Sequence, residues 1–415
     1  MATTQHLLLS PAELAYLHST LSLTPPLRPD GRTAAQFRPL TAETGILPGT
    51  NGSARVCFAD GTEAVVGAKA EVEKSVSTTI LNDDQNSQEL RQRRRRQKSR
   101  GKGTSKTAAT IEEEEDEDED DRGTEREVEE ALAAQERRGE NDWLELSVEI
   151  PGYRDDDSST VFLATMLSEA LLADGELTKK LWINRRFHWK LYLDIILISP
   201  PLSYPLPLLS LTTHLALLAT RLPRLKSEGD EDPMFDDDWA ASQFIYPRSE
   251  SSPSLTATNG SRPPITLLVM AVGENIIFDP SKEELAVADC ALAVSVGETA
   301  GAAEDGGAMD VDVDTEAKTG GRALRLLSVR TVDPPSRLTA PGVPNAVNAA
   351  AWGQGAPVTK ETGLRAAETG NVEGVWKAPR GGTNIALLGA MVQKVLEKGG
   401  IAHEVLEGLD GVELA

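Results

Sequence analysis

Apolar and polar positions alternate with a period of two over several stretches of this chain, which is the pattern of strands that bury one face. The longest such stretch covers residues 187–197, and because Ile196 and Ile198 are apolar too, we expect this strand to lie deep in the core. A hairpin is predicted over residues 54–72, with Asp60-Gly61 suited to its tight turn. Further strands are predicted at 143–150, 265–272, 275–278, 290–296 and 324–329.

Apolar positions three to four residues apart predict helices elsewhere. Ser10, Pro11 and Glu13 supply an N-cap, a first-turn proline and a capping-box partner, so we expect a short leading helix within residues 1–24. Asp157 is a suitable N-cap for a second helix. Two more helices are predicted, at about 206–222 and at about 385–398, the last of which ends at Gly399.

The order of these elements predicts an α+β fold in which sheets pack against helices. We expect one core over residues 25–330, a linker rich in Pro and Gly over 331–382, and a C-terminal helix and tail over 383–415. Some stretches within the core lack an apolar pattern and cannot bury enough surface to fold. They are predicted to be disordered insertions, at 82–140, about 226–262 and 298–320.

The first insertion carries two blocks of opposite charge. The run RQRRRRQKSRGKG begins at Arg91, and ten uninterrupted acidic residues follow from Glu112 to Asp121. The basic run suits a nuclear import signal, a flexible RNA contact, or a segment that only neutralises the acidic block beside it. We favour import or neutralisation over specific RNA binding.

Composition and motifs argue against several classes of function. The chain has 415 residues and a net charge of −23, which argues against an autonomous RNA binder because phosphate contacts need clustered Lys and Arg. Its two cysteines and five histidines show no metal-ligand spacing, so we expect no disulfide framework, no metal site and no cofactor. GxSxG, Walker and GxGxxG motifs are missing. Because no apolar run reaches the length of a membrane span, we expect a soluble intracellular protein without membrane contact.

The charged turn before the predicted hairpin is the most specific feature of the sequence. It reads RPDGR at 28–32 and is followed by Arg38 and Gly52-Ser53. This order resembles the opening of the RNase PH family, and GYRDD at 152–156 with FDPSKEE at 278–284 narrows the resemblance to one type of exosome ring subunit. The resemblance implies a set of structural motif residues, namely Arg28, Asp30, Gly31, Arg32, Gly52 and Ser53.

The resemblance implies an RNase PH-like fold but leaves the activity open, because the family contains phosphate-dependent RNA exonucleases and catalytically silent ring subunits of the RNA exosome. Active members hold the attacking phosphate at a Gly-Ser-Arg turn at a helix N-terminus. This chain has SPPLSYP at 199–205, with prolines that lack amide hydrogens, no glycine for close approach and no arginine before Arg221. We therefore expect that inorganic phosphate is not held.

Active members also carry two aspartates six positions apart, which hold a divalent ion or assist the leaving group. Asp279 matches the first, but Leu285 stands six positions later. A shift of the alignment could bring Glu283 or Glu284 close to that role, and the other interpretation of Asp279-Pro280 is a turn that ends a strand. We interpret Asp279 as a degenerate acidic site and predict no catalytic residue.

Together these features favour a non-catalytic structural subunit, with a phosphate-dependent 3′-to-5′ exoribonuclease as the alternative. The resemblance implies a hexameric ring of RNase PH-like subunits with RNA-binding cap subunits and associated nucleases, processing rRNA and degrading RNA in the nucleus, nucleolus and cytoplasm. Lys69 and Arg154 are candidates for RNA contacts in the channel of that ring, although each also suits an ordinary surface charge. Asp30-Gly31-Arg32 is expected to be a structural turn whose charges pair with neighbouring subunits or with the backbone.

Overall fold

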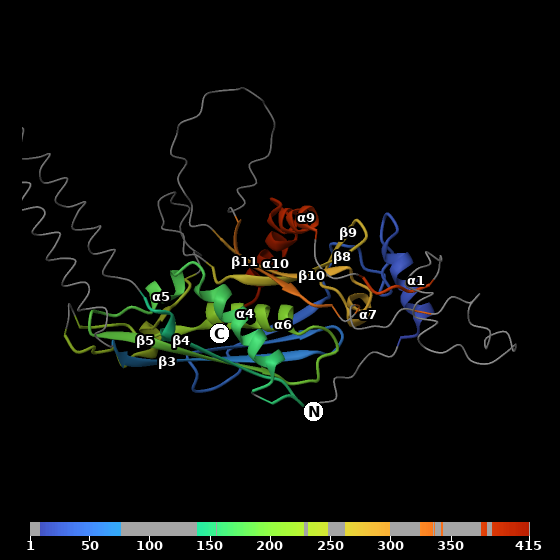
Figure 1. Ribbon diagram of the computed structural model, residues 1–415. Coiled ribbons are helices and arrows are strands. Elements are labelled where there is room, and N and C mark those ends of the chain that lie inside the picture. Colours follow the sequence, from blue (N-terminus) through green and yellow to red (C-terminus); the bar gives the residue numbers. More distant parts are fainter. Residues whose placement is uncertain are drawn as a thin grey trace, which may run out of the picture.

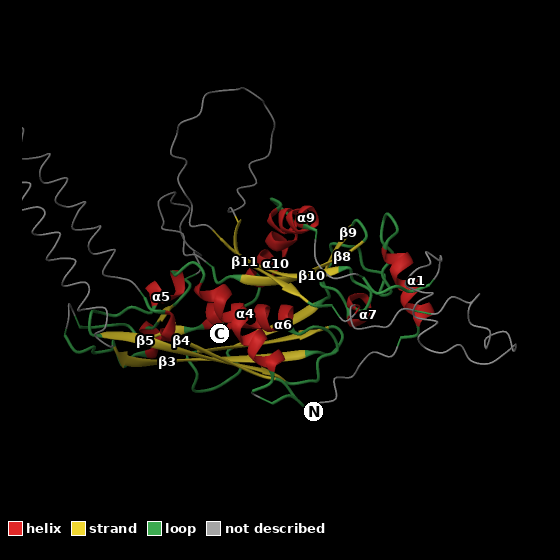
Figure 2. Ribbon diagram, viewed as in Figure 1, coloured by secondary structure: helices red, strands yellow, loops and turns green. Residues whose placement is uncertain are grey.

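The described part of the chain contains helices, two larger β-sheets and a two-stranded sheet, so the predicted α+β class is confirmed (Figure 2). The computed structural model describes residues 9–75, 139–154, 156–227, 231–247, 262–298, 324–334, 336, 342, 375–379 and 384–414. The predicted insertions at 82–140 and 298–320 and the linker at 331–382 therefore lie largely outside the described residues.

The larger sheet has five strands in the order β1-β2-β3-β5-β4. Neighbours are antiparallel except β4, which runs parallel to β5. The strands are β1 (Leu40–Thr44), β2 (Gly52–Phe58), β3 (Glu63–Lys74), β4 (Leu144–Glu149) and β5 (Phe187–Leu197). Alternate residues of β5 are buried as predicted, but Ile196 and Ile198 are exposed. The expectation that these two isoleucines lie deep in the core was wrong, because alternation turns them to the sheet face opposite the helices.

The smaller sheet has four antiparallel strands in the order β11-β10-β8-β9. They are β8 (Ile265–Val272), β9 (Asn275–Phe278), β10 (Cys290–Glu298) and β11 (Leu324–Val332). Every residue of β8 and β10 is buried. Continuous apolar runs fit strands that are covered on both faces, which explains why these segments show no clean alternation.

Helices α4 (Ser158–Leu172) and α6 (Leu206–Ala219) lie between the two sheets (Figure 1). Every residue of α6 is buried, because this helix packs on the larger sheet with one side and on β8 with the other. Helix α4 begins where predicted, with the Asp157 carboxylate accepting a hydrogen bond from the Ser159 amide at 3.2 Å. None of the helices in the described part of the chain is long and apolar enough to cross a membrane.

The remaining elements flank this core. The leading helix is confirmed as α1, and its predicted capping box between Ser10 and Glu13 is present. These elements are α1 (Pro11–Leu21), the 3-10 turns η1 (Asn141–Trp143) and η2 (Trp239–Ala241), α5 (Glu176–Lys180), β6 (Arg221–Leu222), β7 (Gln243–Phe244), α7 (Lys282–Leu285), α9 (Ile385–Leu396) and α10 (Ile401–Asp410). Helix α9 covers the outer face of the smaller sheet, beside α10 (Figure 1).

Two sequence predictions need correction. Residues 226–262 were expected to be disordered, but 231–247 are described and include η2 and β7, which pairs with β6. Aromatic side chains explain the order, since the Phe235 ring packs on Trp189 at 4.9 Å. At the C-terminus one helix and a tail were expected over 383–415, but a second helix, α10, follows α9, because its apolar residues Ile401, Leu406 and Leu409 are buried.

The hairpin between β2 and β3 is confirmed, and Gly61 at its turn has φ +84° with open space around its Cα. We expect Gly61→Ala to lower the free energy of unfolding by about 1–2 kcal/mol, because a Cβ disfavours left-handed backbone. Gly61→Asn should cost less, since asparagine tolerates that region. Urea unfolding of both variants checks this, and equal losses would contradict the backbone explanation.

Candidate functional site: an arginine–carboxylate cluster

The RPDGR turn folds onto itself between α1 and β1. Gly31 has φ +75°, and its amide donates a hydrogen bond to the Arg28 carbonyl at 3.1 Å. The Asp30 carboxylate accepts hydrogen bonds from the Arg32 amide at 3.1 Å and from the Arg32 Nε at 2.5 Å. The predicted structural turn is therefore present, and Asp30 and Arg32 pair with each other within it. Their pairing with neighbouring subunits stays a prediction.

Arg28 reaches from this turn into the interior and meets Glu284 on α7. Its Nε and Nη2 donate to the two Glu284 carboxylate oxygens at 2.7 and 2.8 Å, and both side chains are fully buried. Arg28 also donates to the carbonyls of Phe278 and Asp279 at 3.2 and 3.0 Å. Glu284 in turn accepts from the Ser281 amide in the capping box of α7 at 2.8 Å. The pair therefore joins the N-terminal turn to the segment that follows β9.

Asp279 stands directly after β9 with φ +45°, and it is buried. Arg38 Nη2 lies 2.7 Å from Asp279 Oδ1, while Arg38 Nε and Arg32 Nη1 both lie 2.9 Å from Oδ2. The Arg38 amide donates to the same carboxylate at 2.9 Å. Burial alone would raise the pKa of Asp279, but the hydrogen bonds and charges of Arg38 and Arg32 outweigh it and hold that pKa below the ordinary value of 3.8.

Arg38 also ties in two further segments. Its Nη1 donates to Asp60 Oδ2 in the hairpin turn at 2.6 Å and to Ser203 Oγ at 2.7 Å. Its guanidinium carbon lies 4.5 Å from the centre of the Phe58 ring. One arginine therefore fixes the end of β9, the β2–β3 turn and the 199–205 loop relative to one another.

The 199–205 loop occupies the place where the sequence resemblance would put a phosphate cradle. Ser199 Oγ accepts from the Glu63 amide at 3.1 Å, and Ser203 Oγ is held by Arg38. Helix α6 then begins behind Pro205 without a side-chain cap, and its first residues, Leu206 and Pro207, are buried. Because these residues are buried and Pro207 has no amide hydrogen, the start of α6 is poorly suited to hold an anion.

These contacts decide what the cluster can do chemically. The Asp279 carboxylate already accepts four hydrogen bonds from Arg32 and Arg38, so a metal ion would have to displace them. Both carboxylate oxygens of Glu284, the alternative acidic residue, accept hydrogen bonds from Arg28. The described residues contain no group of three or more His, Cys, Asp and Glu side chains that could hold a metal ion. We conclude that the cluster is a structural ionic lock.

Gly52 and Ser53 also have structural roles. A Cβ on Gly52 would lie 2.5 Å from Thr220 Cα, so only glycine allows β2 to approach the end of α6 this closely. Ser53 is buried, and its Oγ accepts from the Leu47 amide at 2.9 Å. Both residues therefore position the β2–β3 hairpin and do not reach the arginine–carboxylate cluster through any described hydrogen bond.

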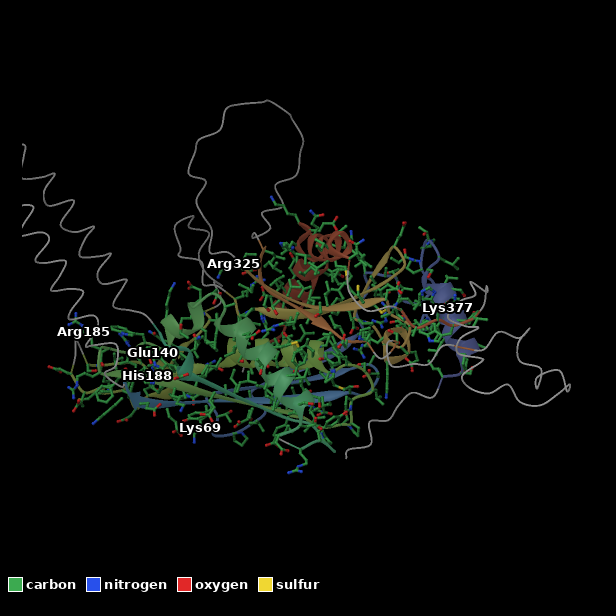
Figure 3. The ribbon with its side chains drawn as sticks, in the orientation of Figure 1. Lys69, Glu140, Arg185, His188, Arg325 and Lys377 are labelled. Atoms are coloured by element: carbon green, nitrogen blue, oxygen red, sulfur yellow. The ribbon has the colours of Figure 1, made fainter. Side chains whose placement is uncertain are left out.

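The two RNA-contact candidates lie on the surface. Lys69 lies on the larger sheet, with its Nζ 3.4 Å from Glu71 Oε1 (Figure 3). Arg154 follows β4 and pairs with Asp156 at 3.1 Å. Both positions are accessible to RNA, and their role in binding it stays a prediction.

Sequence reasoning missed the partners Ser203 and Glu284, although one signal was present. Ser281 and Glu284 have the spacing of a capping box, which indicates a short helix and an engaged glutamate. No local pattern predicts that Ser203 meets Arg38, because the two residues are 165 positions apart.

The depressed pKa of Asp279 predicts a pH-dependent contribution to stability. The contribution is present above the unfolded pKa of about 3.8 and is lost as the pH falls through the lower folded pKa. We expect the difference in free energy of unfolding between the natural protein and Asp279→Asn to shrink between about pH 5 and about pH 3. Guanidinium unfolding over this range measures it, and a difference that stays constant would contradict the ionic lock.

Comparison with known proteins shows which chains this sequence is similar to. It is 27% identical over 293 residues to the exosome complex component RRP42 of Saccharomyces cerevisiae, an alignment that covers 69% of this chain and 81% of the relative. It is 28% identical over 292 residues to the exosome complex component rrp42 of Schizosaccharomyces pombe, covering 69% and 78%. No known family profile matches the chain. The resemblance to the ribosomal-RNA-processing 42 type, carried in the sequence by RPDGR, GYRDD and FDPSKEE, is confirmed.

Two solved structures also match the chain. An archaeal exosome core matches with a TM-score of 0.41 and 15% identity, covering 77% of this chain and 84% of the matched chain. A chain of the Archaeoglobus fulgidus exosome with RNA bound to the active site matches with a TM-score of 0.41 and 13% identity, covering 86% and 95%.

Proposed function

We propose that this chain, which is similar over 69% of its length to the RRP42 component of a yeast exosome, is a non-catalytic structural subunit of an RNA exosome ring. Its role is to assemble with other RNase PH-like ring subunits and to line the channel through which RNA passes. In this way it supports 3′-to-5′ processing and degradation of RNA by separate nucleases. RNA-binding cap subunits and those associated nucleases are its further partners.

The observation that carries the non-catalytic role is the closure of Asp279 and Glu284 by arginines. A catalytic carboxylate that holds a metal ion needs free oxygen lone pairs facing the substrate. Here the oxygens of Asp279 are occupied by Arg32 and Arg38, and those of Glu284 by Arg28. The 199–205 loop adds to this, because its prolines offer no amide hydrogens for phosphate.

Assembly is tested by co-expressing this chain with the other ring subunits of its own organism and weighing the complex by native mass spectrometry. We expect a ring that contains one copy of this chain. A chain that stays monomeric in the presence of all the ring subunits would overturn the proposal.

The rival function is phosphate-dependent exonuclease activity. The purified chain and the assembled ring are incubated with single-stranded RNA and inorganic phosphate, and nucleoside diphosphates are measured. We expect no release that depends on this chain. Release that disappears in Asp279→Asn but persists in Asp237→Asn, an exposed aspartate outside the cluster, would favour the enzyme.

Nuclear, nucleolar and cytoplasmic location is part of the proposal, and the basic run that begins at Arg91 is its candidate import signal. This run lies outside the described residues. Deleting residues 84–140 and following a fluorescent fusion tests the role of the run. We expect less nuclear protein with unchanged ring assembly, whereas an unchanged location would remove the import role.

A further inference from the structure

A cleft of about 450 Å³ opens between α5, the start of β5 and the β6–β7 ribbon, away from the arginine–carboxylate cluster. Helix α5, which borders the cleft, lies at the end of the molecule where Arg185 is labelled (Figures 1 and 3). Its lining residues are Lys179, Lys180, Trp182, Ile183, Trp189, Leu222, Pro223, Leu225, Phe235, Gln243, Phe244 and Ile245.

Aromatic rings from three separate segments line the cleft. Trp189 on β5 is buried and packs against the Phe235 ring at 4.9 Å with a tilt of 43°. Trp182, Phe235 and Phe244 remain partly exposed. The Arg221 guanidinium lies 4.2 Å from the centre of the Phe244 ring. Trp182, Phe235 and Phe244 therefore give the cleft partly exposed rings, and the contacts of Phe235 with Trp189 and of Phe244 with Arg221 hold two of them in place, as in a stacking platform.

The charge of the lining is opposite to that of the chain. The chain as a whole carries a net charge of −23. The charged residues of the lining are Lys179 and Lys180, and Glu176, which is not a lining residue, lies 2.9 Å from Lys179 Nζ. Lys180 Nζ lies 3.6 Å above the Tyr246 ring, and burial lowers the pKa of Lys180 to about 8. Gln243 adds an amide that both donates and accepts hydrogen bonds.

The wall that contains Phe235 is anchored from outside the cleft. Asn184 Nδ2 donates to the Glu231 carbonyl at 2.9 Å, and Arg186 pairs with Asp232 at 3.1 Å. The Lys226 amide donates to the Met234 carbonyl at 2.8 Å. These contacts fix the 231–235 segment against the turn before β5, so the cleft is a formed site.

We propose that this cleft binds an unpaired base of single-stranded RNA, with the base stacked on the partly exposed aromatic rings and the adjoining phosphate facing Lys179. The inference deepens the proposed function, because it adds an RNA contact to a subunit whose channel candidates are Lys69 and Arg154. Stacking platforms tolerate any base, since every base has a π-face. Gln243 is placed to bond the edge of the stacked base.

RNA fits this site better than an apolar peptide does. A peptide anchor would fill the aromatic walls but would bring no anion to Lys179, whose partner within the chain is Glu176 at 2.9 Å. A nucleotide supplies both the flat ring and the anion.

The test measures the affinity of the full chain for fluorescent oligouridylate by anisotropy, with two pairs of matched variants. Phe244→Leu removes a ring in the cleft, and Tyr16→Leu removes an exposed ring on α1. Lys179→Glu reverses a charge in the cleft, and Lys394→Glu reverses a charge on α9 as its control. The two lysines are comparable, because each pairs with a glutamate three residues away and their side chains are 58% and 50% exposed, respectively. We expect the dissociation constant to rise about tenfold in Phe244→Leu and several-fold in Lys179→Glu, with neither control changed.

Crosslinking locates the bound base. RNA that contains 4-thiouridine is irradiated with the full chain, and we expect crosslinked peptides from residues 179–189 and 243–245. Equal affinity of all four variants, crosslinks elsewhere, or displacement of RNA by an aromatic peptide but not by unlabelled RNA would overturn the proposal. Free uridine monophosphate that competes as well as the oligomer would assign the site to a mononucleotide instead.

Ring assembly of the same variants separates this inference from the proposed function. If Phe244→Leu and Lys179→Glu enter the ring, melt at the same temperature as the natural chain and bind RNA equally well, the cleft does not bind RNA. That result would leave the proposed function unaffected. Failure of the natural chain to enter the ring disproves the proposed function and leaves the binding result to stand by itself.

Discussion

Replacing Glu284 by Gln is expected to lower the free energy of unfolding by about 3–5 kcal/mol, the cost of leaving a buried charge without its partner. The Arg28 and Glu284 side chains are fully buried, and Gln cannot neutralise the guanidinium. Gln still fits the space and can accept from the Ser281 amide, so the loss reports the ion pair rather than a cavity. Guanidinium unfolding at neutral pH measures the effect.

The matched control is Glu169→Gln. Glu169 also meets an arginine through both oxygens, at 2.5 and 2.7 Å from Arg330 Nη2, but this pair is exposed. Exposed pairs are screened by water, so we expect a far smaller loss. Equal losses for the two variants would show that burial of the Arg28–Glu284 pair contributes nothing.

Gly52→Ala is expected to lower the free energy of unfolding by about 1–3 kcal/mol, because added volume in a packed interior forces backbone shifts. The new Cβ would lie 2.5 Å from both Thr220 Cα and Thr220 Oγ1. Thr220 cannot move easily, since its hydroxyl donates to the Ala216 carbonyl and its own carbonyl accepts from Ile245. Thermal unfolding followed by circular dichroism measures the loss.

Gly67→Ala is the control, because Gly67 also lies in a strand of the larger sheet. Its Cβ would meet side-chain atoms only, Leu47 Cδ1 at 3.2 Å and Thr50 Cγ2 at 3.7 Å. Leu47 is exposed and can adjust. We expect little loss for this variant, and a loss as large as that of Gly52→Ala would mean that the approach to α6 is not the cause.

The arginine–carboxylate cluster relates stability to the proposed function. Arg28, Arg32 and Arg38 all come from one short segment, and they bind acidic residues at the end of β9 and in α7. In the proposed non-catalytic subunit, these residues join distant parts of the fold instead of holding a ligand.

Much of the architecture could be predicted from local patterns. The hairpin around Gly61, the capped helices α1 and α4, and the buried alternation of β5 all depend on side chains within a few positions of one another. The composition of the 199–205 loop is also a local feature, since its prolines lack amide hydrogens in any fold. The class of fold and the shortage of amide hydrogens in the 199–205 loop could therefore be predicted from the sequence.

Other features depended on contacts between distant residues. The outward orientation of Ile196 follows from which sheet face receives α6, and the order of 231–247 follows from the packing of Phe235 on Trp189. Whether Asp279 is a free carboxylate also could not be predicted, because its partners lie more than 240 positions earlier in the chain.

The sequence by itself determined many of the element types, the α+β class, the resemblance and the prolines without amide hydrogens in the 199–205 loop, because each depends on residue identity and short-range spacing. Only the tertiary structure showed that Asp279 and Glu284 accept hydrogen bonds from arginines and that Gly52 lies too close to Thr220 for a Cβ to fit. It also showed that aromatic residues from three segments line one cleft. The physical reason is that charge pairing, close packing and stacking act between neighbours in space, and chain topology alone determines which residues become neighbours.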